Sequence, residues 1–319
     1  MKIHLLKSAF ILYLVFNIQY SASAQQDPQY TQYMFNMLAI NPAYAGSRDV
    51  VSATALYRRQ WWGVDGAPQT MTFSADMPIR KEKIGVGIVA SNDRLGRLGV
   101  SNLSGYFSYR IKVHSRGTLA FGITGGGSFY STDFNNIRLS EDPSASASDP
   151  AFQQYASVQP LVGGGVYYST DRFYVGFSAP NLLSYNLVRA TETESSAKKF
   201  QHVFLMAGYV FPLTEVLTLK PSGLVKWVMG APTQMDLNAQ LWFYDKMSAG
   251  LSARTDGGGR YLSSLSILLE LQATENIRIG YAYDFPFNNT RRLSYNTHEI
   301  MIRYEMGFRN KKMISPRYF

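Results

Sequence analysis

Hydrophobic and polar residues alternate along most of the chain. Over residues 233–243 every second position is hydrophobic and the intervening positions are mainly polar; the hydrophobic ones are Met235, Leu237, Ala239, Leu241 and Phe243. The ranges 69–77 and 117–130 repeat this pattern. Because successive side chains of a β-strand point to opposite faces, a period of two predicts strands with one oily and one polar face.

About fourteen such segments follow one another. They lie at roughly 50–61, 69–77, 83–92, 100–112, 117–130, 156–169, 172–179, 200–211, 216–228, 233–244, 246–254, 260–271, 276–284 and 296–307. Several are longer than the usual strand of about 5–6 residues, and a tilted membrane-spanning strand needs about 9–11. No hydrophobic run after residue 24 has the length of a transmembrane helix. We therefore predict an all-β fold: a transmembrane antiparallel β-barrel of about 14 strands.

A soluble double-sheet sandwich is the alternative fold. Two features disfavour it. The polar faces carry small residues and amides more than Lys and Glu, and strand ends carry aromatic residues, as at Trp61-Trp62 and Tyr167-Tyr168. Aromatic residues at strand ends are typical of the two membrane interfaces of a barrel.

Connection lengths agree with a barrel. If the chain enters from the periplasm, the three longest connections, 131–155, 180–199 and 285–295, all fall on the extracellular side. Short connections such as 113–116 and 170–171 fall on the periplasmic side. Short periplasmic turns and long extracellular loops are the rule for outer-membrane barrels.

The first 24 residues have the pattern of a secretory signal peptide. Lys2 and Lys7 accompany a short hydrophobic stretch, and Ala22-Ser23-Ala24 fits a cleavage site. Cleavage there removes both lysines and lowers the formal net charge from +9 to +7. We expect a signal peptide at 1–24, an N-terminal periplasmic or plug segment at 25–49, the barrel at 50–308, and a C-terminal periplasmic tail at 309–319. The predicted location is the outer membrane.

The segment 27–47, DPQYTQYMFNMLAINPAYAGS, does not alternate. Its hydrophobic residues Tyr30, Tyr33, Met34, Met37 and Leu38 fall at helical spacing, and Pro42 prevents helix beyond about Ile40. We expect a short amphipathic helix at 29–39 and then an extended, turn-rich approach to the first strand. The segment can fill the lumen, cover the periplasmic rim, or be a loose, disordered leader. We favour the lumen or the rim, because so many exposed aromatic and Met side chains would be costly in water.

Catalytic and metal-binding signatures are weak. The chain has no cysteine and four scattered histidines, and it contains neither HExxH nor GxSxG. Its glycine triplets, 125–127 and 163–165, lie inside predicted strands and not in phosphate loops. We predict no enzyme activity, no catalytic residues, no cofactor and no structural metal. The acidic loop 139–152 leaves calcium open, and basic residues are too dispersed for nucleic-acid binding.

Five separated strings resemble the PorP/SprF family of type IX secretion system membrane proteins. They are QQDPQYTQYMFNMLAINPAYAGS at the mature start, LYRRQWWGVDGAPQTMTFSADMPI (56–79), FYVGFSAPNLL (173–183), THEIMIRYEMGF (297–308) and SPRYF (315–319). The resemblance implies a non-enzymatic outer-membrane barrel of the type IX secretion and gliding machinery. It also implies a partner: a secreted, adhesin-like cell-surface protein that the barrel helps to secrete or anchor, together with type IX components.

Such a partner has two surfaces available. One is the periplasmic side, with the N-terminal segment, the turns and the C-terminal tail; the other is the outer face, with loops 131–155, 180–199 and 285–295. Membrane lipid and lipopolysaccharide are expected contacts of the wall. The candidate partner-binding or plug residues are Tyr30, Tyr33, Met34, Phe35, Met37, Asn41, Pro42, Tyr44, Trp61, Trp62, Asp149, Phe152, Pro316, Arg317, Tyr318 and Phe319. The alternative function is an outer-membrane channel or transporter for small or hydrophobic solutes, since about fourteen strands can leave an aqueous lumen.

Overall fold

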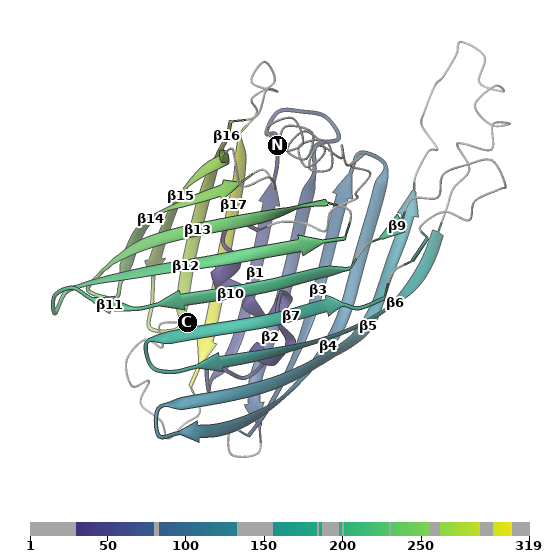
Figure 1. The fold of residues 1–319 in the computed structure, drawn as a ribbon. Coiled ribbons are helices and arrows are strands. Elements are labelled where there is room, and N and C mark those ends of the chain that lie inside the picture. Colours follow the sequence, from purple (N-terminus) through teal and green to yellow (C-terminus); the bar gives the residue numbers. More distant parts are fainter. Residues whose placement is uncertain are drawn as a thin grey trace, which may run out of the picture.

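Fourteen antiparallel strands close into one barrel in the described part of the chain (Figure 1). The computed structural model describes residues 30–79, 83–132, 156–183, 201–229, 231–255, 262–287 and 296–307, and the backbone alone of residues 185–186 and 198–199. Consecutive strands pair with each other, and β1 pairs with β17 to close the wall. The prediction of a 14-strand barrel is confirmed.

The barrel strands average well above the length of strands in soluble proteins. Their bounds are β1 Val51–Arg59, β2 Gln69–Ile79, β3 Ile84–Leu95, β4 Leu98–His114, β5 Gly117–Thr132, β6 Ala156–Ser169, β7 Phe173–Asn181, β10 His202–Tyr209, β12 Leu217–Val228, β13 Ala231–Phe243, β14 Met247–Thr255, β15 Leu262–Gln272, β16 Ile277–Pro286 and β17 Thr297–Met306. The short β11 (Phe211–Pro212) pairs with β12, and β8 (Tyr185–Asn186) pairs with β9 (Lys198–Lys199) outside the barrel.

The two ends of the barrel differ in their connections. The start of β1 and the end of β17 lie at one end, which we call the short-turn end; β4 and β5 are joined there by residues 115–116. The opposite end, which we call the long-loop end, receives the connections between β5 and β6, between β7 and β10, and between β16 and β17. The predicted segregation of long and short connections is therefore present in the strand order.

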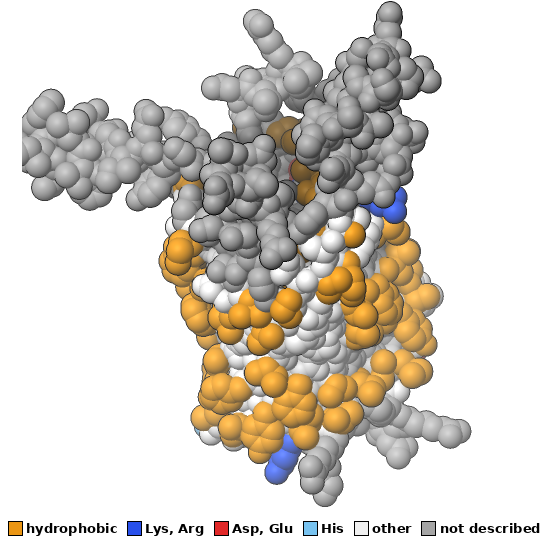
Figure 2. All heavy atoms as spheres, turned by 90° about the vertical axis from the view of Figure 1, so that its right-hand side faces the viewer, with side chains coloured by type: hydrophobic (Ala, Val, Ile, Leu, Met, Phe, Trp, Pro, Cys, Tyr) orange, Lys and Arg blue, Asp and Glu red, His pale blue; other side chains and the backbone are white. Residues whose placement is uncertain are grey.

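Hydrophobic side chains cover the outside of the wall. Figure 2 shows them over most of the outer surface in view, with Lys and Arg only near its upper and lower edges. Outward residues such as Ile123, Leu237 and Leu251 are each more than half exposed. A hydrophobic band around a closed antiparallel barrel is the surface that a bilayer requires. No helix in the described ranges is long and apolar enough to cross a membrane.

The inside of the wall is polar, and residues 30–50, which we call the plug, occupy the lumen (Figure 1). The lumen is thus the correct one of the two positions that the sequence allowed. The expected amphipathic helix is wrong: the plug forms three 3-10 turns, Tyr33–Phe35, Met37–Ala39 and Pro42–Tyr44. The wall surrounds the plug and supplies hydrogen-bond partners for its backbone, so a continuous helix with one polar face has no advantage there.

Candidate functional site: the plugged lumen

The start of the plug is held by three buried charged residues near the long-loop end. Glu299 on β17 accepts hydrogen bonds from the backbone N–H groups of Thr31 (3.0 Å) and Gln32 (2.8 Å). Arg58 on β1 lies 2.8 Å from Glu299 and 2.7 Å from Asp284 on β16. The Thr31 hydroxyl donates to Asp284 and accepts from Arg58 at 2.8 Å. Each carboxylate is therefore paired with a cation and hydrogen-bonded, as buried charges require.

The middle of the plug is held by backbone and amide hydrogen bonds. Asn41 caps the third turn by accepting the Ala43 N–H at 3.0 Å, and its amide donates to the Val166 carbonyl at 3.0 Å. The Ser178 hydroxyl donates to the Ile40 carbonyl at 2.8 Å. These contacts reach β6 and β7, on the opposite side of the barrel from Glu299 in the strand order.

Glycines on the wall let the plug backbone approach closely. A Cβ at Gly85 would collide with the Ala45 carbonyl, and a Cβ at Gly122 would collide with the backbone of Ala43. Gly122 belongs to a glycine-rich stretch of β5, where close backbone approach is one use of glycine inside a strand. The shape of the wall therefore matches the path of the plug at these two points.

The end of the plug is fastened near the short-turn end. The Gly46 N–H donates to Asp76 on β2 at 2.7 Å, and Arg110 on β4 donates to the Gly46 carbonyl at 2.6 Å. Arg48 forms an ion pair with Glu305 on β17 at 2.5 Å. The plug therefore crosses the lumen from the long-loop end to the short-turn end.

Hydrophobic packing fills the space between these polar contacts. Tyr33, Met37 and Leu38 are almost completely buried in a cluster with wall residues. Tyr44 meets Tyr167 of β6 edge-on, with ring centroids 5.5 Å apart. Burying large side chains in this way stabilises the plug by roughly 1.5–3 kcal/mol for each.

The structure brings half of the candidate residues into one place. Tyr30, Tyr33, Met34, Phe35, Met37, Asn41, Pro42 and Tyr44 all lie in the plug. Trp61 and Trp62 lie apart from them, 47% and 54% exposed, in the connection after β1 at the long-loop end. The candidates Asp149, Phe152, Pro316, Arg317, Tyr318 and Phe319, and the acidic loop 139–152, are outside the described residues.

Sequence reasoning missed the charged residues that hold the plug. Arg58, Asp284 and Glu299 come from β1, β16 and β17 and meet only in the closed barrel. A signal was present, because all three occupy inward positions of alternating segments. Charges on the inner face of so many strands predict partners inside the lumen, since unpaired charges are not buried.

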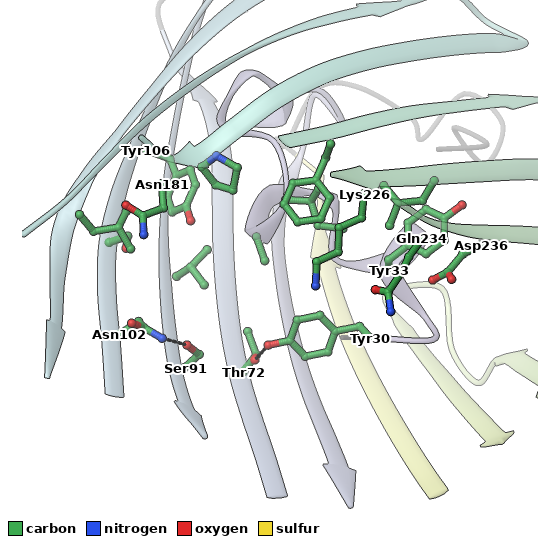
Figure 3. Close-up of a pocket in the computed structure, with 18 residues that line it drawn as sticks. Tyr30, Tyr33, Thr72, Ser91, Asn102, Tyr106, Asn181, Lys226, Gln234 and Asp236 are labelled. Carbon is green, nitrogen blue, oxygen red and sulfur yellow. Dashed lines mark hydrogen bonds between the residues drawn. The ribbon is translucent and has the colours of Figure 1, made fainter. Parts of the chain in front are cut away.

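A cavity of about 140 Å³ remains on the long-loop side of the plug, and we call it the upper cavity (Figure 3). Tyr30, Tyr33 and Ile40 of the plug form part of its lining, and Tyr30 donates to or accepts from Thr72 at 2.6 Å. The rest of the lining is mixed: Leu161, Phe204 and Leu224 are hydrophobic, whereas Asn102, Asn181, Lys226, Gln234 and Asp236 are polar. Within the described ranges, no group of three His, Asp or Glu side chains is arranged to hold a metal ion.

Most of the chain matches a known protein family. Residues 22–304 match the family described as type IX secretion system membrane protein PorP/SprF. The chain belongs to this family. PorP/SprF membership and a lipid-facing barrel together place the protein in the outer membrane. A search of curated proteins finds no match.

Solved structures similar to this PorP/SprF protein are outer-membrane barrels. The CymD monoaromatic hydrocarbon channel is 13% identical with a TM-score of 0.50, over 88% of this chain and 93% of that one. A Pseudomonas aeruginosa FadL homologue is 13% identical with a TM-score of 0.43, over 84% and 93%. Omp33 of Acinetobacter baumannii is 8% identical with a TM-score of 0.43, over 80% and 96%. At these identities the likeness concerns the barrel fold alone.

Proposed function

We propose that this barrel is a plugged, non-enzymatic platform of the type IX secretion machinery that helps to secrete or anchor an adhesin-like cell-surface protein. One observation carries the proposal. The plug is tied to the wall at both ends of the lumen, by Glu299 near the long-loop end and by Asp76 and Glu305 near the short-turn end. A lumen blocked by a plug that is tied to the wall at both ends is suited to holding a partner and not to conducting solutes.

The upper cavity is the partner site in this proposal. It lies above the plug on the side of the long loops, so a segment of a surface protein that enters the barrel mouth would meet Tyr30 and Ile40 as its floor. Its mixed lining suits a short peptide segment, which has both hydrophobic side chains and backbone groups that need hydrogen bonds. The exposed Trp61 and Trp62 at the same end extend the contact surface.

The other parts of the chain complete the proposed assembly. Residues 1–24 direct export and are removed, and the short-turn end faces the periplasm, as the rule for connection lengths requires. The tail 309–319 would then contact periplasmic type IX components. Secretion across the outer membrane and attachment to gliding machinery both need such a link.

The second candidate function is a channel for small or hydrophobic solutes. The hydrophobic side chains Leu161, Phe204 and Leu224 in the upper cavity favour it, because a small apolar molecule could rest there. This function requires the plug to move, which would break the hydrogen bonds of Thr31 and Gln32 to Glu299 and the ion pair of Arg48 with Glu305. The first candidate requires no such movement.

A cavity-filling substitution tests the platform. Ser104 on β4 is buried and lines the upper cavity, whereas its neighbour Leu103 faces outward and is half exposed. Ser104→Trp should fill the cavity, and Leu103→Trp places the same ring in lipid as a matched control. Tagged protein would be cross-linked in its native envelope and purified with its partners. We expect a surface protein to accompany wild type and Leu103→Trp, and to be lost with Ser104→Trp.

Conductance separates the two candidate functions. The purified wild-type protein in a planar bilayer should show no steady open-pore current if the plug closes the lumen. Large steady currents from the intact chain would favour the channel. Equal recovery of the same surface protein with both Trp variants would exclude the upper cavity as the partner site.

A further inference from the structure

Among the strand residues that the structure describes, outward-facing basic side chains are confined to one sector of the wall. Among the described strand residues, the outward-facing positions include three basic residues, Arg59 on β1, Arg94 on β3 and His298 on β17, and no Asp or Glu. Every other charged residue on these strands is on the inward alternation, as Arg58 and Glu299 are. A cation on the lipid-facing side is tolerated only near a membrane interface, so this restriction to one sector needs an explanation.

The three basic residues lie in a single row across neighbouring strands. His298 is directly opposite Arg59, Arg59 is opposite Gln69, and Gln69 is opposite Arg94. Directly opposite side chains are about 5 Å apart at Cβ, and neighbouring strands are about 4.8 Å apart. The row therefore spans about 14 Å from His298 to Arg94 at the long-loop end of the barrel.

Aromatic residues fix one end of this row. His298 Nδ1 and the Tyr281 hydroxyl are hydrogen-bonded at 2.7 Å, and the Trp62 ring lies 5.1 Å from the His298 ring. The Arg59 guanidinium lies over the same Trp62 ring at 5.0 Å. The backbone N–H of Trp62 donates to the Asn296 carbonyl at 2.9 Å. This bond joins the connection after β1 to the residue that precedes β17. The Nε of Arg59 has no hydrogen-bond partner among the described residues.

A hydrophobic groove lies directly below the row on the same outer face. It has a volume of about 460 Å³. Small residues, Ala55 and Ala90, lie on its floor, and larger outward side chains surround them: Tyr57, Met71, Phe73, Ile300 and Ile302. Between the groove and Arg94, Asn92 donates to Ser101 at 2.8 Å. Descending from the long-loop end, this sector is thus cationic, then polar and aromatic, and then hydrophobic.

We propose that this sector binds a phosphorylated glycolipid of the outer leaflet. The phosphates lie along the row Arg94, Arg59 and His298, and an acyl chain lies in the groove over Ala55 and Ala90. Phosphate is the anion that Arg recognises by paired N–H donors. Trp62 and Tyr281 sit at the headgroup level, where aromatic rings of membrane proteins concentrate.

The length and position of the row favour a glycolipid over a phospholipid. A phospholipid offers one phosphate, whereas a phosphorylated disaccharide can place anionic groups at both ends of a row about 14 Å long. The row also lies at the long-loop end, which is the outer-leaflet side by the connection rule. At the other end of the same strands the outward residues are hydrophobic: Val51, Ile79, Ile84 and Met306.

Native mass spectrometry of the folded, full mature chain tests the proposal. The probes are bis-phosphorylated lipid A, the same lipid A without phosphates, and phosphatidylglycerol. The double variant Arg59→Gln/Arg94→Gln removes two of the three basic residues of the row, and Arg116→Gln/Arg172→Gln removes two cations from the short-turn end as a matched control. We expect one retained lipid A per wild-type chain, and about a ten- to thirty-fold weaker retention for the first variant, since each basic residue near a surface contributes about one kcal/mol. The control variant should retain it like wild type.

A second variant tests the groove without changing charge. Ala55→Trp/Ala90→Trp fills the groove and should also weaken lipid A retention. A heat-modifiable mobility on SDS gels confirms that this variant has folded into a barrel. Equal retention of lipid A with and without phosphates would overturn the proposal. Equal retention of phosphatidylglycerol and lipid A would overturn the assignment to a glycolipid. Unchanged retention by Arg59→Gln/Arg94→Gln would overturn the site itself.

Discussion

Glu299 on the last strand accepts a hydrogen bond from the backbone N–H of Gln32 in the plug at 2.8 Å. The same strand pairs with β1 and so closes the barrel. The carboxylate is fully buried and also forms the ion pair with Arg58. Glu299 therefore joins the plug to the pair of strands that closes the wall.

Loss of the Glu299 charge should weaken both closure and plugging. Glu299→Gln leaves Arg58 with Asp284 as its remaining ion-pair partner and removes a strong acceptor from two plug N–H groups. Breaking a buried ion pair costs about 3 kcal/mol. Urea unfolding in lipid bilayers measures this loss. Glu275→Gln, in an exposed turn, should change the free energy of unfolding by less than about 0.5 kcal/mol. Equal midpoints for the two variants would contradict the role of Glu299.

Displacement of the plug should follow from a side chain at Gly122. A Cβ there collides with the backbone of Ala43, whereas a Cβ at Gly125, three residues along the same strand, meets nothing within 4 Å. Gly122→Val should therefore push the plug from its path and raise single-channel conductance, and Gly125→Val should not. Both changes add the same side chain to β5. If both variants stay closed, the plug is held by contacts other than this close approach.

A charge on the outer wall should be costly in proportion to its depth. Ile123 lies in the middle of β5, faces outward and is 64% exposed, while Leu119 faces outward nearer the short-turn end. Ile123→Arg should cost about 2–4 kcal/mol, and Leu119→Arg about 0–1 kcal/mol. Equilibrium folding into lipid vesicles measures both. Similar costs at the two positions would mean that the bilayer midplane does not lie near Ile123.

Loss of core packing should loosen the plug without opening the wall. Met37 is 1% exposed and belongs to the plug. Met37→Ala should cost about 2–5 kcal/mol, because it removes buried contacts and leaves a cavity. We expect faster proteolysis within the plug and an unchanged barrel in circular dichroism. The outward Met71→Ala, which faces lipid, is the control and should leave proteolysis as in wild type.

Much of the fold is predictable from the alternation of residues such as those between Met235 and Phe243. The bilayer requires hydrophobic side chains at outward positions, and the lumen permits polar side chains at inward positions. Alternation with a period of two therefore indicates strands between lipid and a polar interior. The lengths of the connections support the predicted number of strands. One missed or extra strand would place long and short connections at the same end of the barrel. The hydrophobic plug residues, such as Tyr33 and Met37, are visible as a break in this period.

The conformation of the plug was not predictable in the same way. Helical spacing of Tyr30, Tyr33 and Met37 favours a helix only where one face meets a core and the other meets water. Inside the lumen the wall contacts the segment on all sides, and Glu299 and Ser178 bind backbone groups near the two ends of the expected helix, at Gln32 and Ile40. Tertiary contacts therefore replaced the regular helix with short turns.

The sequence alone determined that the chain is a long-stranded barrel with an oily exterior, a polar interior and an unusual hydrophobic segment before the first strand. Only the tertiary structure decided which residues meet: Arg58 with Glu299 inside, and Arg59 with His298 outside, across almost the whole length of the chain. Alternation sets the face of a strand on which a side chain lies, because that is a local property of the backbone. Register and closure set its neighbours, because these depend on pairing between strands far apart in sequence.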